Sequence, residues 1–195
     1  MRLDFQRIAA AVPHGASVLD LGCAEGDMLA YLRAERAARG VGADIDRDGL
    51  IRCFERGVQA VYCDINKGLG MFYDNAFAVV ALSQTLQSVR LPPQQLLREM
   101  LRIGDVAIVS FPNFGHWRLR QQLLSGVMPG NPLLPYHWHD TPNVRYCTIK
   151  DFEQLCREEG LQTRQSVFLA GTQQITFAPN LYADMAIYVL SRTAQ

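Results

Sequence analysis

The sequence predicts an α/β fold: a mostly parallel sheet of seven strands with helices on both faces. Short apolar segments alternate with amphipathic helical segments along most of the chain, as in successive βαβ units. The run Phe77–Leu82 is continuously apolar, which is typical of a strand buried on both faces. A length of 195 residues suits one domain, so we expect residues 1–195 to form a single unit that binds ligands beyond the carboxyl ends of its strands.

Each expected element follows from apolar periodicity and from the glycine or proline residues that bound it. Residues 112–148 are rich in proline and lack a clear period, so we expect an irregular lid or partner-binding segment there. In chain order the expected elements are helix Leu3–Val12, strand Ser17–Leu21, helix Asp27–Ala38, strand Val41–Ile45, helix Asp48–Arg56, strand Val58–Cys63, strand Phe77–Leu82, helix Pro93–Ile103, strand Val106–Phe111, helix Ile149–Glu159, and strands Gln162–Leu169 and Met185–Ser191.

The composition argues against several classes of protein. Lys+Arg and Asp+Glu both number 19, and this zero net charge weighs against a nucleic-acid partner. No apolar run reaches membrane-span length, and the N-terminus lacks the features of a signal peptide. The five cysteines include no CxxC pair, which disfavours a disulfide framework or a structural zinc site and fits a reducing cytoplasm.

A glycine turn, Gly22-Cys23-Ala24-Glu25-Gly26, joins the first central strand to a helix. Glycines at such a turn allow the backbone to approach a ligand closely. The spacing differs from the dinucleotide fingerprint G-x-G-x-x-G, and no Gly-Lys-Ser/Thr follows as it would in a phosphate-binding loop. The turn is therefore expected to hold a ligand without phosphates.

Acidic residues follow the next two strands. Asp44 ends the second strand, where a carboxylate can accept hydrogen bonds from ribose hydroxyls. Asp64 ends the third strand and is expected to accept from an adenine amino group, with Ile65 packing on the ring. A rim this acidic suits a sulfonium cation better than a pyrophosphate; its members are Asp20, Glu25, Asp44, Asp46 and Asp64.

The pattern Asp20-x-Gly22-x-Ala24-x-Gly26 resembles the first motif of class I S-adenosylmethionine-dependent methyltransferases, and Asp44 matches their ribose-binding acid. Alanine at position 24 departs from the glycine usual there. The resemblance implies a Rossmann-like class I methyltransferase fold with a site for S-adenosylmethionine or S-adenosylhomocysteine. The residues implied to form that site are Asp20, Gly22, Cys23, Ala24, Gly26, Asp44, Ile45, Asp64, Ile65 and Ser83.

Two longer blocks narrow the family. They are Phe-Pro-Asn-Phe-Gly-His-Trp at 111–117 and Trp-x-Asp-Thr-Pro-Asn at 138–143, and the chain resembles the MetW family of methionine biosynthesis from Val18 to about Leu161. Ala78 departs from the aspartate usual in related strands. The resemblance implies a cytoplasmic protein that partners and activates a homoserine O-acyltransferase of the MetX type.

Methyl transfer needs mainly alignment and exclusion of water, with a base only where the nucleophile must lose a proton. No catalytic residue is assigned; the candidates are His116, Tyr136 and His139, with Ser83, Gln84, Asn113, His137 and Asp140 as further polar groups after the strands. His116 could act as a base in a pocket, but the favoured interpretation is a histidine that holds the loop by hydrogen bonds.

No metal site is expected near His137 and His139, because no further histidine or cysteine cluster completes a ligand set. Trp117, Tyr136 and Trp138 are consistent with an aromatic wall over the pocket, with a contact surface for another protein, or with core packing.

Three functional hypotheses follow from different classes. The first is a regulatory partner of the acyltransferase that senses S-adenosylmethionine. The second is an active methyltransferase on a small molecule. The third is a dinucleotide-dependent oxidoreductase, against which the glycine spacing argues.

Overall fold

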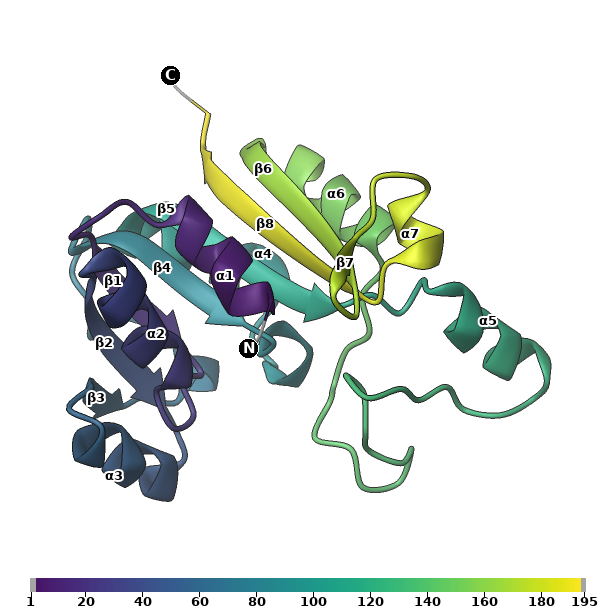
Figure 1. Cartoon of the computed structure of the whole chain (residues 1–195), viewed down its shortest axis with the longest axis horizontal. Helices are drawn as coiled ribbons and strands as arrows, with labels where there is room; N and C mark the ends of the chain where they lie inside the picture. The colour runs from purple at the N-terminus through teal and green to yellow at the C-terminus, as the bar shows by residue number, and fades with distance from the viewer. Residues whose placement is uncertain (1–2, 194–195) are drawn as a thin grey trace.

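The computed structural model describes residues 3–193, and its centre is one eight-stranded sheet in the order β3-β2-β1-β4-β5-β8-β6-β7 (Figure 1). The expected α/β class with one mostly parallel, helix-flanked sheet is confirmed. The strands are β1 (Ser17–Leu21), β2 (Arg39–Asp44), β3 (Gln59–Tyr62), β4 (Phe77–Ser83), β5 (Gly104–Pro112), β6 (Leu161–Ala170), β7 (Gln173–Gln174) and β8 (Met185–Arg192).

Strands β3, β2, β1, β4 and β5 are parallel, whereas β8 pairs antiparallel with β5 and with β6. The expected count of seven strands is wrong by one. The additional strand is β7, whose two glutamines pair with Leu169 and Ala170 at the edge of the sheet. Two polar residues carry no apolar alternation, so the sequence gives no sign of this strand.

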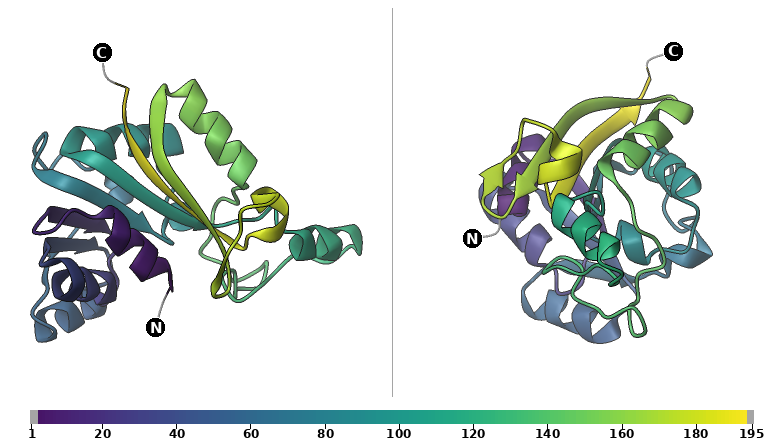
Figure 2. Two further views of the ribbon diagram at one scale, coloured as in Figure 1. Left: turned by 45° about the horizontal axis from the view of Figure 1, so that its top comes forward. Right: turned by 90° about the vertical axis from the view of Figure 1, so that its right-hand side faces the viewer.

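Helices cover both faces of the sheet (Figure 2). They are α1 (Leu3–Ala11), α2 (Asp27–Arg36), α3 (Arg47–Glu55), α4 (Pro93–Ile103), α5 (Trp117–Leu124), α6 (Ile149–Glu158) and α7 (Pro179–Tyr182), with 3₁₀ turns η1 (Ile65–Lys67) and η2 (Leu86–Ser88).

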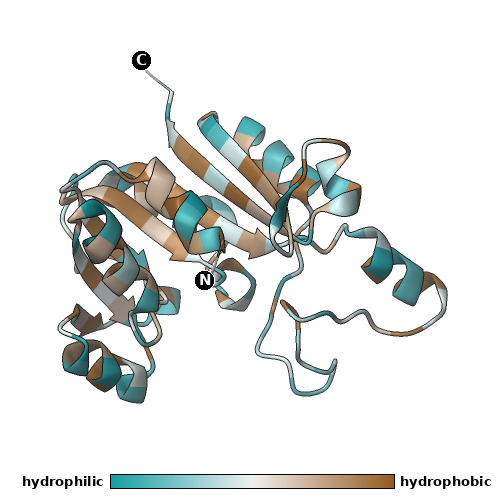
Figure 3. Ribbon diagram, viewed as in Figure 1, coloured by the Kyte–Doolittle hydropathy of each residue, from teal (hydrophilic) through white to brown (hydrophobic). Residues whose placement is uncertain are grey.

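Alternate residues of the central strands enter two separate hydrophobic clusters. Val18 and Val79 pack on the side of α1, α2 and α3, while Leu19 and Val80 pack on the side of α4 and α6. This alternation follows from the two-residue period of a strand, and it explains why these strands are apolar throughout. In Figure 3 the central strands are mostly brown with pale bands, whereas the helices carry both teal and brown.

The expected irregular segment 112–148 is only partly irregular, because Trp117–Leu124 forms α5. This helix buries only Leu119, so its sequence has no apolar stripe that would reveal a helix. Helix α2 also ends at Arg36, earlier than expected, because Ala37 adopts a left-handed conformation with φ of 51°. No helix within residues 3–193 is long and apolar enough to cross a membrane.

Candidate ligand site

A pocket of about 840 Å³ lies at the carboxyl ends of β1, β2, β3 and β4. Its volume falls within the range of small-molecule sites. The residues implied to bind the cofactor all line it except Gly26, which begins α2 behind the turn. The structure thus brings together Asp20, Gly22, Cys23, Ala24, Asp44, Ile45, Asp64, Ile65 and Ser83.

The turn after β1 depends on glycine at its first position. Gly22 has φ of 77°, and its amide donates to the Ala43 carbonyl at 2.7 Å. A Cβ at this residue would lie 2.5 Å from Thr85 Oγ1, so the absence of a side chain lets the turn pass beside the end of β4. Gly26 also has positive φ, 78°, where the turn enters α2. Both glycines are therefore required by the backbone path.

Asp44 fixes the other wall of the turn. Its Oδ2 accepts from the Ala24 amide at 2.8 Å, and its Oδ1 accepts from the Asp46 amide at 2.9 Å. Ala24 is held at φ of 47°, a left-handed conformation that is unfavourable for a residue with a Cβ. The alanine found here in place of the usual glycine therefore keeps the glycine-like backbone and carries the strain.

Helix α3 supports the turn from behind, which the sequence analysis missed. A Cβ on Gly49 would lie 2.9 Å from the Ala24 carbonyl oxygen, so only glycine lets the helix pack this closely. The Cys53 thiol donates to that same oxygen at 3.3 Å. A glycine inside a helical segment is the signal that could have indicated this close approach.

The charges at the site are unevenly compensated. Glu25 pairs with Arg52 and with Arg56, each at 2.8 Å. Among the described residues, no cation pairs with Asp20 or Asp44. The inner end of the pocket therefore has a negative potential that favours a cationic ligand.

Asp20 is the most unusual of these acids. Asp20 is 2% exposed, and its Oδ1 is buried with no hydrogen-bond partner. Burial, reinforced by the nearby charge of Asp44, raises the pKa of the Asp20 carboxyl from 3.8 to about 7. A buried acceptor without a partner is unfavourable, and it lines a pocket where a ligand can supply the missing donor.

At the β2 and β3 end, the pocket has an acidic edge beside two isoleucines. Asp64 Oδ1 accepts from the Asn66 amide at 3.0 Å, which caps η1. Ile65 is buried and Ile45 is largely exposed, and both line the pocket together with Asp64. Apolar side chains and a carboxylate in one pocket provide the surfaces that a planar base with an amino group requires.

Polar groups gather where β4 ends. The hydroxyls of Ser83 and Ser110 lie 3.2 Å apart, and the Gln84 amide donates to Ser110 Oγ at 3.1 Å. Gln84 has φ of 54°, so this strand terminus is held in a strained conformation beside the pocket.

Of the three catalytic candidates, only Tyr136 lines this pocket. His116 is 9% exposed and caps α5, where its Nδ1 accepts from the Arg118 amide at 3.2 Å; burial lowers its pKa. His139 stacks on His137 with ring centroids 5.6 Å apart, away from the lining residues.

Two of the further polar candidates are also placed away from the pocket lining. Asn113 is fully buried and donates to the Ala183 carbonyl at 2.7 Å. The Asp140 amide donates to the His137 carbonyl at 3.3 Å. Across residues 3–193, no three His, Cys, Asp or Glu side chains form a group suited to a metal ion.

Comparison with known proteins identifies the family of this chain. The model of a family described as Methionine biosynthesis protein MetW matches residues 2–190. The chain belongs to the MetW family. A bifunctional methionine biosynthesis protein MetXA/MetW from Rhodopirellula baltica is 35% identical over 206 residues, which cover 98% of this chain and 33% of that protein. The chain thus spans about a third of the length of that relative.

Solved structures of the same fold extend over nearly all of this MetW chain. An S-adenosylmethionine-dependent methyltransferase from Mesorhizobium loti has a TM-score of 0.72 at 17% identity, covering 98% of each chain. The [4+2]-cyclase SpnF has a TM-score of 0.69 at 18% identity, covering 99% of this chain and 82% of its own. These likenesses establish the class I methyltransferase fold, and their differing activities show that the fold does not define the reaction.

Proposed function

We propose that this MetW protein binds S-adenosylmethionine or S-adenosylhomocysteine in the pocket above β1–β4 and acts as a partner and activator of a MetX-type homoserine O-acyltransferase. The observation that carries the ligand is the buried, unpartnered Oδ1 of Asp20 in a pocket without a compensating cation. A ligand with an ammonium group supplies both the donor and the charge, and a sulfonium group adds further positive charge.

The remaining residues fit the same ligand. Gly22 has no side chain, so the turn packs directly against Thr85 and its backbone lines the pocket. Asp44 keeps its carboxylate at the pocket wall through two backbone amides, and its remaining lone pairs are suited to ribose hydroxyls. Asp64 and Ile65 would receive the adenine.

The partner is supported by a different observation. In the Rhodopirellula baltica relative, a MetXA/MetW chain, the region matching this protein is one part of a longer polypeptide. Fusion holds two units at a high effective concentration, which benefits proteins that act together. We infer that the MetW unit of this protein likewise acts together with an acyltransferase unit.

An active methyltransferase on a small molecule is the second candidate. It is favoured by Tyr136, whose side chain lines the ligand pocket, and by the strained Gln84 at the end of β4. Methyl transfer from labelled S-adenosylmethionine to small molecules of a cell extract, lost in Asp44→Ala, would support it.

Ligand binding is tested by thermal unfolding with S-adenosylhomocysteine, S-adenosylmethionine and NAD. A ligand at 100 times its Kd adds about 2.7 kcal/mol of stability, which raises Tm by roughly 5–10 °C for a domain of this size. The shift should vanish in Asp44→Ala and persist in Asp48→Ala, an exposed acid of α3 that lies outside the pocket lining. No shift with either sulfur ligand, or a shift with NAD alone, contradicts the proposed site.

The partner role is tested with the purified acyltransferase of the same organism. We expect co-elution at micromolar concentrations and a higher acyltransferase rate when the MetW protein is added. Absence of both effects would refute this part of the proposal.

A further inference from the structure

Residues 117–146 form an arm that leaves the sheet after β5 and returns to it before α6 (Figure 1). Helix α5 projects away from the sheet, and Leu119 is its one buried residue. The arm therefore presents most of its surface to solvent.

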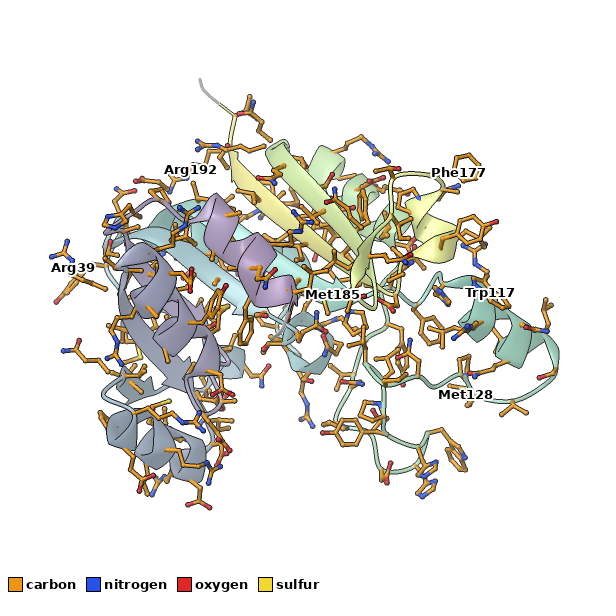
Figure 4. All side chains as sticks on the ribbon, viewed as in Figure 1. Arg39, Trp117, Met128, Phe177, Met185 and Arg192 are labelled. Atoms are coloured by element: carbon orange, nitrogen blue, oxygen red, sulfur yellow. The ribbon has the colours of Figure 1, made fainter. Side chains whose placement is uncertain are left out.

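The exposed surface of the arm is unusually apolar. Leu124 is 88% exposed and Trp138 is 73% exposed, and both tryptophans of the sequence lie on this segment. Figure 4 shows Trp117 and Met128 at the end of the molecule far from Arg39. More than half of the exposed large apolar side chains of the described chain belong to the arm: Trp117, Leu123, Leu124, Val127, Met128, Tyr136, Trp138, Val144 and Tyr146. A concentration of this kind marks a protein interaction site.

Charge is correspondingly scarce. Residues 117–146 contain no lysine and no glutamate. Two of the three arginines are bound to backbone carbonyls: Arg120 donates to the Gly115 oxygen at 2.5 Å, and Arg145 donates to the Leu91 oxygen at 3.0 Å. Arg118 lies 5.3 Å from the ring centre of Trp117. A surface with few charges and with exposed Trp, Tyr, Met and Arg side chains has the composition that is typical of an interface core.

The base of the arm is firmly attached. The Arg145 guanidinium donates to the carbonyls of Val89, Arg90 and Leu91, and the Val144 amide donates to the Gln87 carbonyl at 2.9 Å. At the other end, His116 caps α5. The segments that flank the arm are also joined to each other, because the Phe114 amide donates to the Cys147 carbonyl at 2.9 Å. An apolar surface held in place loses less entropy when it binds than a free loop would.

We propose that the arm 117–146 is the surface that docks the MetX-type acyltransferase, an inference that rests on the proposed function. The match to the Rhodopirellula baltica MetXA/MetW protein covers 98% of this chain, so the arm has its counterpart inside a polypeptide named for both units. In such a fused chain the acyltransferase unit is held close to the arm, so it is the partner that we expect to cover the exposed apolar side chains.

The test compares matched substitutions of exposed side chains on the arm and elsewhere. Leu124→Lys and Trp138→Ser alter the arm. The controls are Ile51→Lys on α3 and Tyr73→Ser before β4, which make comparable changes at exposed sites outside the arm. The Kd for the purified acyltransferase is measured by titration calorimetry, and thermal unfolding checks that each variant is folded.

We expect each arm variant to weaken the Kd by about tenfold or more, as for a central interface residue, with both controls within twofold of wild type. Binding by the arm variants at wild-type strength refutes the docking surface and leaves the partnership intact. Absence of binding by wild type refutes the partnership and the inference together. If wild type instead self-associates and only that association is lost in the arm variants, the arm is an interface between copies of this chain, and the proposal is wrong.

Discussion

Replacing Asp20 by asparagine should change the unfolding free energy in a pH-dependent way. The value for the variant minus that for wild type should be larger at alkaline pH than at acidic pH. The Asp20 carboxyl has a pKa of about 7 in the folded protein, above its ordinary 3.8. Well below pH 3.8 both the folded and the unfolded states hold this proton, and the ionisation of Asp20 does not change the unfolding free energy. As pH rises toward 7, the unfolded state ionises first, and the folded state becomes less favourable relative to it.

The size of the effect follows from the same two pKa values. Above pH 7 the buried carboxylate destabilises the fold by about 4 kcal/mol, of which about 2–3 kcal/mol develops between pH 5 and pH 8. Asparagine has nearly the same shape and does not ionise. The unfolding free energy of Asp20→Asn minus that of wild type should therefore increase by about 2–3 kcal/mol between these two pH values.

Urea denaturation at pH 5 and pH 8 measures this difference, and taking the change between two pH values cancels any effect of asparagine on packing. The exposed Asp105→Asn variant is the control and should show no such change. A difference between Asp20→Asn and wild type that is constant from pH 5 to pH 8 would refute the inferred burial of an ionising group. The same variant should also lose the Tm shift with S-adenosylhomocysteine, because it removes the charge opposite the ligand cation.

Three further outcomes are expected from the turn and the arm. Gly22→Ala should lower the unfolding free energy by about 1–3 kcal/mol, seen in urea melts, because its φ is 77° and its Cβ would meet Thr85 at 2.5 Å; an unchanged melt would contradict the turn geometry. Ala24→Gly should raise the unfolding free energy by about 0.5–1 kcal/mol, because relief of a φ of 47° exceeds the added freedom of the unfolded chain; a lower value would mean that Ala24 is not strained. Arg145→Ala should make residues 125–144 cleavable by protease at concentrations that leave wild type intact, since three carbonyl contacts at the base of the arm are lost; an unchanged cleavage pattern would show that other contacts hold the arm.

The sequence predicted most of the fold because the sheet is buried on both faces. Strands such as Phe77–Ser83 are apolar throughout, and helix Pro93–Ile103 has both an apolar stripe and a starting proline, so its bounds were predicted correctly. The elements that were missed are short and bury little: β7 has two residues, α7 has four, and α5 buries only Leu119. Elements this short and this little buried have no apolar periodicity from which they could be predicted.

The residues of the candidate ligand site were accessible to sequence reasoning because they follow consecutive strands, and parallel strands end at one edge of the sheet. The hydrogen bonding and the packing of these residues could not be predicted from the sequence. The close approach of Gly49 to Ala24 arises only when α3 packs against the turn. The unpartnered Oδ1 of Asp20 is likewise a property of the folded site. Such properties depend on contacts between segments far apart in the sequence.

The arm shows most clearly what the sequence leaves undecided. Its aromatic residues are consistent with a pocket wall, a protein contact or core packing, because an irregular segment has no period that separates inward from outward positions. The structure gives the apolar side chains of the arm different environments: Leu119 and Leu134 are buried, Tyr136 lines the candidate ligand pocket, and Trp138 faces solvent. Trp138 is 73% exposed on a segment with few charges, so most of its apolar surface is not buried by this chain. A second protein docked on the arm, as proposed above, would bury that surface.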